Sequence, residues 1–166
     1  MRNIKIPIRY IPPSLSSKDK QRQIRMLLKS KKMYSDQHKY YTRKKLASYK
    51  SKPSSHIQDA KRIYKVDRIV PGKELSKKTG CSISAMKKII NKGEGAYYSS
   101  GSRPNQTPQS WGVARLASAL TAGKAAAIDY DIIERGCDHT KPAFLFAQKS
   151  KKKYGYGHSK TRKYKV

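Results

Sequence analysis

Charge is distributed very unevenly along this chain, and that distribution most limits what the chain can fold into. Residues 93–147 contain five Lys and Arg and five Asp and Glu, so this stretch has no net charge. The whole formal charge of +29 therefore lies before and after it. Because like charges repel one another in a compact state, the sequence predicts a small neutral core that carries basic extensions.

Two helices are predicted inside the neutral stretch. Thr107-Pro108 is typical of a helix start, because the hydroxyl caps free amides and proline suits the first helical position. An apolar face at helical spacing follows, made of Val113, Leu116, Ala117 and Leu120. Gly123 is the expected left-handed stop, and a second helix is expected over residues 124–135. We expect the two helices to pack as an antiparallel hairpin.

The fold class follows from these helices and from composition. The chain has 166 residues, of which 36% are hydrophobic, so one domain or one small domain with arms is expected. The predicted fold is mainly α with a few short strands (α+β), with extended basic N- and C-terminal arms. Four segments are expected: a basic arm and helix (1–53), a basic helical segment (54–92), the neutral core (93–147) and a basic, disordered tail (148–166).

The basic segments also contain local signals. Residues 3–12 alternate like a strand, but Pro7 restricts them to an edge strand or an extended arm. This arm either folds back on its own domain or adds to a neighbouring subunit as a strand. Helices are expected to begin after Leu15-Ser16 and after Pro53-Ser54-Ser55, and a short strand is expected over Val66–Val70.

Residues 72–92 have the spacing of a helix–turn–helix. The residues that such a unit turns inward are apolar, and Gly80 stands where its turn needs glycine. Ser82 is the expected cap of the second helix, which then presents Ser84, Lys87 and Lys88 to a DNA major groove. A plain helical hairpin explains the same spacing, and the sequence does not separate the two.

The high positive charge predicts a polyanionic partner. With a net charge of +29 and a pI near 10.3, nucleic acid is the leading candidate, followed by an anionic membrane surface or an acidic protein. Tyrosines interleaved with the basic residues add rings that stack on bases. The candidate contacts are Lys44, Lys45, Lys87, Lys88, Lys151, Lys152, Lys153, Arg162 and Lys163. Neither a signal peptide nor an apolar run long enough for a transmembrane helix is recognised.

Catalytic chemistry is not indicated. A polar loop is predicted from Tyr97 to Thr107, and its candidate anion-binding residues are Ser99, Ser100, Ser102 and Arg103. Such loops more often form hydrogen bonds within themselves. Two cysteines are too few for a disulfide framework, so synthesis in a reducing compartment is expected. Cys137-Asp138-His139 lacks the partners of a zinc site and is expected at a helix end. We therefore expect no enzyme, no metal and no cofactor.

Three stretches carry a resemblance to a known family: GAYYSSGSRPNQTPQSW followed by ARLASAL, IPIRYIPPSLSSKDKQRQI near the N-terminus, and YYTRKK around Tyr40. They resemble small basic proteins of large double-stranded DNA viruses that infect algae and amoebae. The resemblance covers most of the chain, excludes the tail and names no catalytic residue. It implies a viral setting.

By analogy, the first hypothesis is a non-enzymatic virion protein, a minor capsid component. It would be made in the host cytoplasm and lie on the inner side of the capsid. Its expected partners are other capsid proteins, with viral DNA or an anionic inner membrane facing its charge. The alternative is a nucleic-acid-binding protein, either helix–turn–helix-like or genome-condensing. A third hypothesis, an enzyme acting on nucleic acid through the Tyr97–Thr107 loop, predicts a turnover that is lost on Arg103→Ala.

Overall fold

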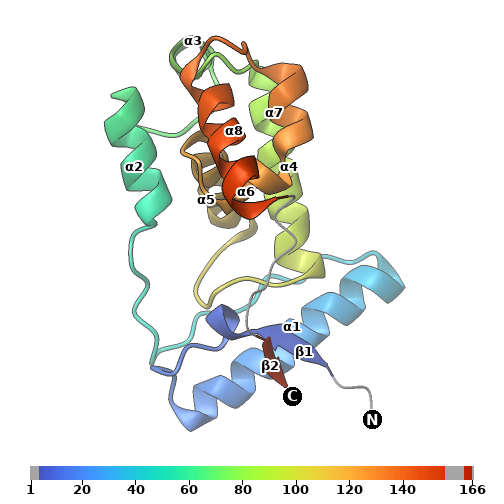
Figure 1. Ribbon diagram of the computed structural model, residues 1–166. Coiled ribbons are helices and arrows are strands. Elements are labelled where there is room, and N and C mark those ends of the chain that lie inside the picture. Colours follow the sequence, from blue (N-terminus) through green and yellow to red (C-terminus); the bar gives the residue numbers. More distant parts are fainter. Residues whose placement is uncertain (1–3, 156–162, 166) are drawn as a thin grey trace. The chain divides into compact units, whose positions relative to one another are not determined.

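The computed structural model of the protein describes residues 4–155 and 163–165. The fold is mainly α with a two-stranded antiparallel sheet, as predicted (Figure 1). The helices of the described part are α1 (Ser17–Gln37), α2 (Ser55–Tyr64), α3 (Lys73–Thr79), α4 (Ile83–Ser99), α5 (Pro108–Leu120), α6 (Lys124–Ile128), α7 (Tyr130–Gly136) and α8 (Pro142–Tyr154). The strands are β1 (Lys5–Pro7) and β2 (Lys163–Lys165), and a short 3-10 helix covers Ile8–Tyr10.

The described residues form two compact units. The first unit contains residues 4–52, 94–108 and 163–165, and the second unit contains residues 53–93 and 109–155. These units cross the four segments expected from composition, because the neutral stretch contributes residues 94–108 to the first unit and the rest to the second.

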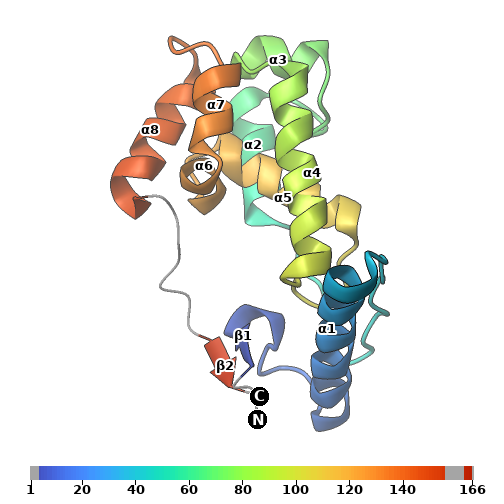
Figure 2. The ribbon, with the colours of Figure 1, turned by 90° about the vertical axis from the view of Figure 1, so that its right-hand side faces the viewer.

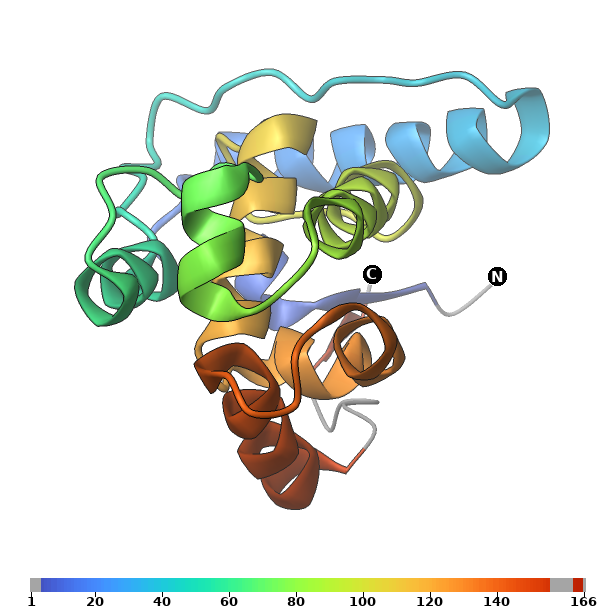
Figure 3. The same ribbon diagram turned by 90° about the horizontal axis from the view of Figure 1, so that it is seen from above.

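The first unit is built on α1. The Ser16 hydroxyl accepts a hydrogen bond from the Asp19 amide at 3.2 Å, the cap that the sequence predicted. One face of α1 is buried, including Met26 and Leu27. After α1 the chain continues without helix or strand through residues 38–54 (Figure 3), and Leu46 from this segment packs against Leu15 and Met26.

Residues 4–11 fold back on the first unit, which is the first of the two alternatives expected for the arm. β1 pairs with β2 in antiparallel register, with Ile6 opposite Tyr164. Ile6, Tyr10 and Ile11 are buried, and the Gln23 side-chain amide donates to the Tyr10 carbonyl oxygen at 3.2 Å. Ile6 and Tyr10 therefore pack into the protein's own core, whereas Ile8 is exposed and the strand alternation covers only residues 5–7.

The second unit contains the larger apolar core. Leu75, Met86, Ile89, Leu116 and Ile133 are almost fully buried and belong to one cluster. α4 and α7 lie side by side in this unit (Figures 1 and 2). Since α5 begins at Pro108 and buries the predicted face, the helix start at Thr107-Pro108 is confirmed.

The single helix predicted over residues 124–135 is wrong, because the structure has two helices that meet at Asp129. The Asp129 carboxylate is buried and accepts two hydrogen bonds from the Arg115 guanidinium, at 2.7 and 2.8 Å. Lys92 lies 3.1 Å from the same carboxylate. Ile128, the last residue of α6, is 41% exposed.

The predicted left-handed stop is one residue out of place. Ala122 has φ 58°, whereas Gly123 has φ −72° and precedes α6 in extended conformation. Gly123 is required by space, because a side chain there would clash with the Ser118 hydroxyl. The sequence pattern located the turn but not its strained residue.

Two further expectations are wrong. Residues 66–70 form no strand; Val66 and Ile69 are buried in irregular backbone. The tail is not a disordered extension where it is described, because residues 148–154 complete α8 and residues 163–165 form β2. α8 buries Ala143, Phe144, Ala147 and Ser150 along one side, so helical packing continues into the basic run.

Across the described residues, no helix is long and apolar enough to cross a membrane.

Candidate nucleic-acid interface

Residues 72–92 form two helices joined by a tight turn, an arrangement that the helix–turn–helix and the plain helical hairpin share, and below helix–turn–helix is only the name of this segment. α3 ends at Thr79, Gly80 caps it with a left-handed φ of 84°, and α4 begins three residues after Gly80, at Ile83. Leu75, Cys81, Met86 and Ile89 point inward and are at most 2% exposed. The Ser82 hydroxyl accepts from the Ala85 amide at 3.1 Å, so the predicted cap is confirmed.

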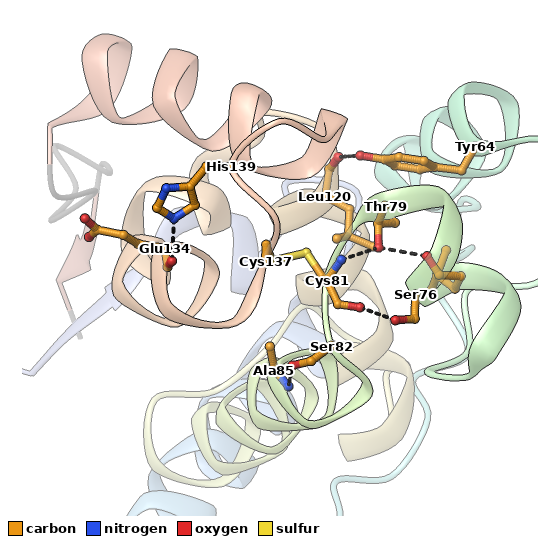
Figure 4. The surroundings of a disulfide bond; sticks show 11 residues. Tyr64, Ser76, Thr79, Cys81, Ser82, Ala85, Leu120, Glu134, Cys137 and His139 are labelled. Carbon is orange, nitrogen blue, oxygen red and sulfur yellow. Dashed lines mark hydrogen bonds between the residues drawn. A yellow bond between two sulfur atoms is a disulfide. The ribbon is translucent and has the colours of Figure 1, made fainter.

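A disulfide bond between Cys81 and Cys137 fixes the turn of this unit (Figure 4). Backbone hydrogen bonds of 2.8 Å flank it on both sides, from the Ser82 amide to the Gly136 carbonyl and from the Asp138 amide to the Gly80 carbonyl. The turn is thereby joined to the end of α7. Sequence reasoning misses this bond because 56 positions separate the cysteines. The one available signal is that a glycine precedes each of them.

The outer face of α4 carries the side chains predicted for it. Ser84, Lys87 and Lys88 are all exposed. A pocket of about 270 Å³ opens between the start of α4 and α7, and Ser84, Lys88, Asp131 and Arg135 are among its lining residues. Two cations and one carboxylate face this pocket, so its rim is net basic at neutral pH.

The other predicted basic contacts are spread over both units. Lys44 and Lys45 lie exposed in the irregular segment after α1, and Lys163 lies exposed in β2; all three belong to the first unit. Lys152 and Lys153 are exposed in the last turn of α8, and the half-buried Lys151 places its Nζ 4.2 Å from the centre of the Tyr130 ring. Arg162 lies outside the described residues.

Each unit has an excess of positive charge. The described residues of the first unit hold 18 Lys and Arg against three Asp and Glu, and those of the second unit hold 18 against seven. Among residues 4–155 and 163–165, ion pairs join Arg62 to Asp59, Lys78 to Glu74, and both Lys92 and Arg115 to Asp129.

The predicted loop from Tyr97 to Thr107 is wrong at its start, because residues 97–99 form the end of α4, and the remainder takes the alternative in which it bonds to the protein itself. The buried Arg43 guanidinium donates to the Ser30 hydroxyl and the Tyr97 carbonyl at 2.9 Å, and to the Ser102 hydroxyl at 2.8 Å. Ser102 is 1% exposed and donates to the Arg103 carbonyl at 2.8 Å. Its hydroxyl is thus committed within the fold, whereas Ser99, Ser100 and Arg103 lie nearer the surface.

Arg43 is a residue that sequence reasoning misses, because it stands in a basic run with nothing to distinguish it. Burial lowers the pKa of its guanidinium, although the side chain stays charged at neutral pH. Burial likewise raises the pKa of the Tyr97 phenol, whose oxygen accepts from the Arg43 amide at 2.9 Å. We call the bonds of Arg43 to Ser30, Tyr97 and Ser102 the Arg43 network.

The sequence Cys137-Asp138-His139 forms a helix end, as expected. The Asp138 carboxylate accepts from the Thr140 amide and hydroxyl, which lowers its pKa. The His139 ring stacks on Phe144 with centroids 3.9 Å apart and bonds to the Glu134 carbonyl at 2.7 Å. Among the described residues, no cluster of His, Cys, Asp and Glu has the arrangement of a metal site.

Comparison with known proteins identifies one family. The family described as "Family of unknown function (DUF5824)" matches residues 7–135. This range contains the helix–turn–helix and the Arg43 network and stops before α8. No curated protein and no solved structure matches the chain.

Proposed function

This chain belongs to the DUF5824 family of unknown function, and from the charge and geometry of its two units we propose that it is a nucleic-acid-binding protein. Binding is mainly electrostatic, because lysine and arginine neutralise phosphates and release the counterions condensed on nucleic acid. The observation that carries this proposal is the excess of cations over carboxylates in both units.

The helix–turn–helix supports a contact with double-stranded nucleic acid. In such units the second helix enters the major groove and its outer side chains meet phosphates and base edges. Here α4 is the second helix, Lys87 and Lys88 are exposed on it, and the disulfide holds the turn that sets its direction. Lysine recognises phosphate as a point charge and gives little sequence information. We therefore propose binding with weak sequence preference.

The test is a titration of a labelled duplex against the disulfide-intact full-length protein, followed by fluorescence anisotropy at several salt concentrations. We expect log K to fall linearly with log salt, with a slope of about −0.9 for each phosphate contact. Lys87→Ala with Lys88→Ala should weaken binding to every duplex sequence and reduce the slope by about 2.

Lys73→Ala with Lys77→Ala is the matched control, since both lysines are exposed on α3 and the charge change is the same. It should weaken binding less than the change on α4. An affinity that does not respond to salt contradicts the proposal. Strong preference for one duplex sequence, lost in the α4 variant, replaces weak preference with sequence reading.

The virion role implied by the resemblance stays a prediction. A minor capsid protein contacts other capsid proteins on the inner side of the shell, where its charge meets viral DNA or an anionic membrane. Mass spectrometry of purified particles tests this setting: stoichiometric presence supports it, and absence removes it without affecting the binding proposal.

A further inference from the structure

We infer that the first unit carries a stacking site for unpaired nucleobases, made of Tyr34, Tyr40 and Tyr98, which we call the tyrosine platform. This inference rests on the proposed function, because it adds single-stranded nucleic acid as a ligand class to a protein that binds phosphates. Tyr98 lies at the end of α4, in the first unit, whereas Lys87 and Lys88 lie on the part of α4 that belongs to the second unit.

The three rings of the tyrosine platform come from three parts of the chain and meet. The rings of Tyr34 and Tyr98 are nearly parallel, with 7° between their planes and 6.4 Å between their centroids. The ring of Tyr40 is tilted by 43° to both, with its centroid 4.8 Å from that of Tyr98 and 6.2 Å from that of Tyr34. Aromatic rings attract one another at these separations.

Tyr40 reaches the other two rings because the chain reverses after α1. His38 adopts a left-handed conformation with φ 50°, and the amide of Lys39 donates to the Met33 carbonyl at 3.0 Å. This is the hydrogen bonding of a helix that ends in a tight turn. The turn returns Tyr40 toward the last turns of α1, where Tyr34 lies.

The Arg43 network holds the platform from below. The Arg43 guanidinium carbon lies 3.8 Å from the centre of the Tyr97 ring, and the Tyr97 ring meets that of Tyr98 edge-on with centroids 5.2 Å apart. The Ser30 hydroxyl on α1 also donates to the Tyr98 carbonyl at 3.2 Å. Tyr97 is fully buried, so a rigid base fixes the ring of Tyr98. A site fixed in advance loses little conformational entropy on binding.

Tyr40 is what makes the platform a binding site. Tyr40 is 71% exposed, although its ring contacts the rings of Tyr34 and Tyr98. An open ring face suits a flat aromatic partner, and every nucleobase has one. Bases in a duplex are stacked on one another and show only their edges in the grooves. The fitting partner is therefore an unpaired base, DNA or RNA.

The charge around the platform fits the backbone of such a strand. Lys39 adjoins Tyr40 in sequence, Lys31 lies one helical turn before Tyr34, and both are exposed. The first unit has 18 Lys and Arg against three acidic side chains, the larger imbalance of the two units. Stacking rings combined with cations along the backbone is the usual arrangement of single-strand binding surfaces.

The experiment compares four fluorescein-labelled probes with the full chain at one salt concentration. They are an oligothymidylate and an oligouridylate of about 12 nucleotides, an abasic strand of the same length and charge, and a duplex. We expect the unmodified protein to bind both base-carrying strands more tightly than the abasic strand. Tyr40→Ala should raise the Kd for the two base-carrying strands about 5- to 100-fold and leave the Kd for the abasic strand unchanged.

Two further variants separate stacking from other effects. Tyr40→Phe keeps the ring and should restore the affinity, whereas Tyr40→Leu keeps apolar bulk and should not. Tyr154→Ala removes another exposed tyrosine, 36% exposed at the end of α8, and serves as the control. Because Tyr40 is largely exposed, its variants should keep the circular dichroism spectrum and melting temperature of the parent.

The outcomes distinguish the two proposals. Equal affinity for base-carrying and abasic strands, or an unchanged Kd after Tyr40→Ala, overturns the tyrosine platform while duplex binding still supports the proposed function. No binding of any probe overturns both. If Tyr40→Ala weakens the binding of oligouridylate alone, the site is assigned to RNA. If it weakens the binding of oligothymidylate alone, the site is assigned to DNA.

Discussion

At the scale of single residues, the buried Arg43 side chain should contribute strongly to the stability of the first unit. Its guanidinium donates to three oxygens, and two of these belong to hydroxyls. Replacing it by Ala leaves those buried groups without a donor and opens a cavity beneath Tyr97. We predict that Arg43→Ala lowers the free energy of unfolding by about 3 kcal/mol, measured by urea denaturation.

Arg43→Lys tests the same point with the charge retained. A lysine ammonium cannot direct donors to three separated oxygens in the way a planar guanidinium does. The free energy of unfolding of Arg43→Lys should lie between those of the parent and Arg43→Ala. Lys44→Ala, which changes the exposed neighbour, is the control and should change stability by less than about 0.5 kcal/mol. If Arg43→Ala behaves like Lys44→Ala, the Arg43 network is not as described.

Asp19 should give the first unit a specific response to acid. The Ser48 hydroxyl, which bonds to its carboxylate at 2.6 Å, and the Ser48 amide, at 3.0 Å, hold the pKa of Asp19 below its ordinary 3.8. Because the pKa is lowered on folding, the stabilisation is present above 3.8 and is lost as pH falls through the folded pKa. The stability difference between Asp19→Asn and the parent should therefore be present above pH 3.8 and disappear as the pH falls through the lowered pKa of Asp19.

Denaturation midpoints across this pH range measure the effect. Ser48→Ala removes the hydroxyl that donates to the Asp19 carboxylate. Its stability difference from the parent should therefore also shrink as the pH falls, but by less than that of Asp19→Asn. A stability difference between Asp19→Asn and the parent that stays constant with pH would show that the Ser48 contacts do not favour the charged carboxylate.

At the scale of elements, the disulfide is the main constraint on the helix–turn–helix. A cross-link between residues 56 positions apart restricts the unfolded chain, which is worth about 4 kcal/mol in the chain-entropy account. We predict that Cys81→Ala with Cys137→Ala lowers the free energy of unfolding by up to this amount. Reductant should destabilise the parent similarly and leave the double variant unchanged; if the parent does not respond, the bond is absent in solution.

The elements that were predicted correctly are those with local causes. The caps at Ser16 and Ser82, the helix start around residues 53–55 and the buried face of α5 follow from neighbours in sequence. The elements that were missed depend on distant partners. At the break, the partners of Asp129 are Arg115 and Lys92, which are distant in sequence. The helix α8 extends into the basic run while one of its faces is buried in the core. No pattern within these segments contains that information.

The same division holds for the candidate sites. Lys87 and Lys88 were placed on the outer face of the helix–turn–helix from spacing alone, and they lie there. The interleaved tyrosines near Tyr40 indicated a binding surface, but Tyr98 is 58 positions further along the chain and its place beside Tyr40 is a tertiary contact. Ser102 was a candidate for an anion site because the sequence does not indicate that the buried Arg43 is its partner.

At the scale of the whole molecule, the net charge of +29 should make stability depend on the ionic surroundings. Mutual repulsion of the cations opposes the compact state, and a polyanion that binds the folded protein stabilises it by mass action. We predict that the melting temperature rises with salt, by screening, and rises further when a polyanion such as heparin is added at low salt.

Differential scanning fluorimetry measures both effects. A neutral polymer of similar size is the control and should leave the melting temperature unchanged. A polyanion that lowers the melting temperature at every ratio would mean that it prefers the unfolded chain, and the folded surface would then not be the binding surface.

The bond between Cys81 and Cys137 also gives the molecule a closed topology. The backbone from residue 81 to residue 137, with α4 to α7 inside it, forms a ring from which the two remaining lengths of chain lead off. A single backbone cut within the ring separates no fragment, whereas the same cut in α2 or α8 releases a piece of chain once the fold opens. A protein nicked in the ring should run as one species on a non-reducing denaturing gel and as two after reduction. One cut and two lanes would thus report whether the ring was closed when the protein was isolated, and two species in both lanes would mean that it was open.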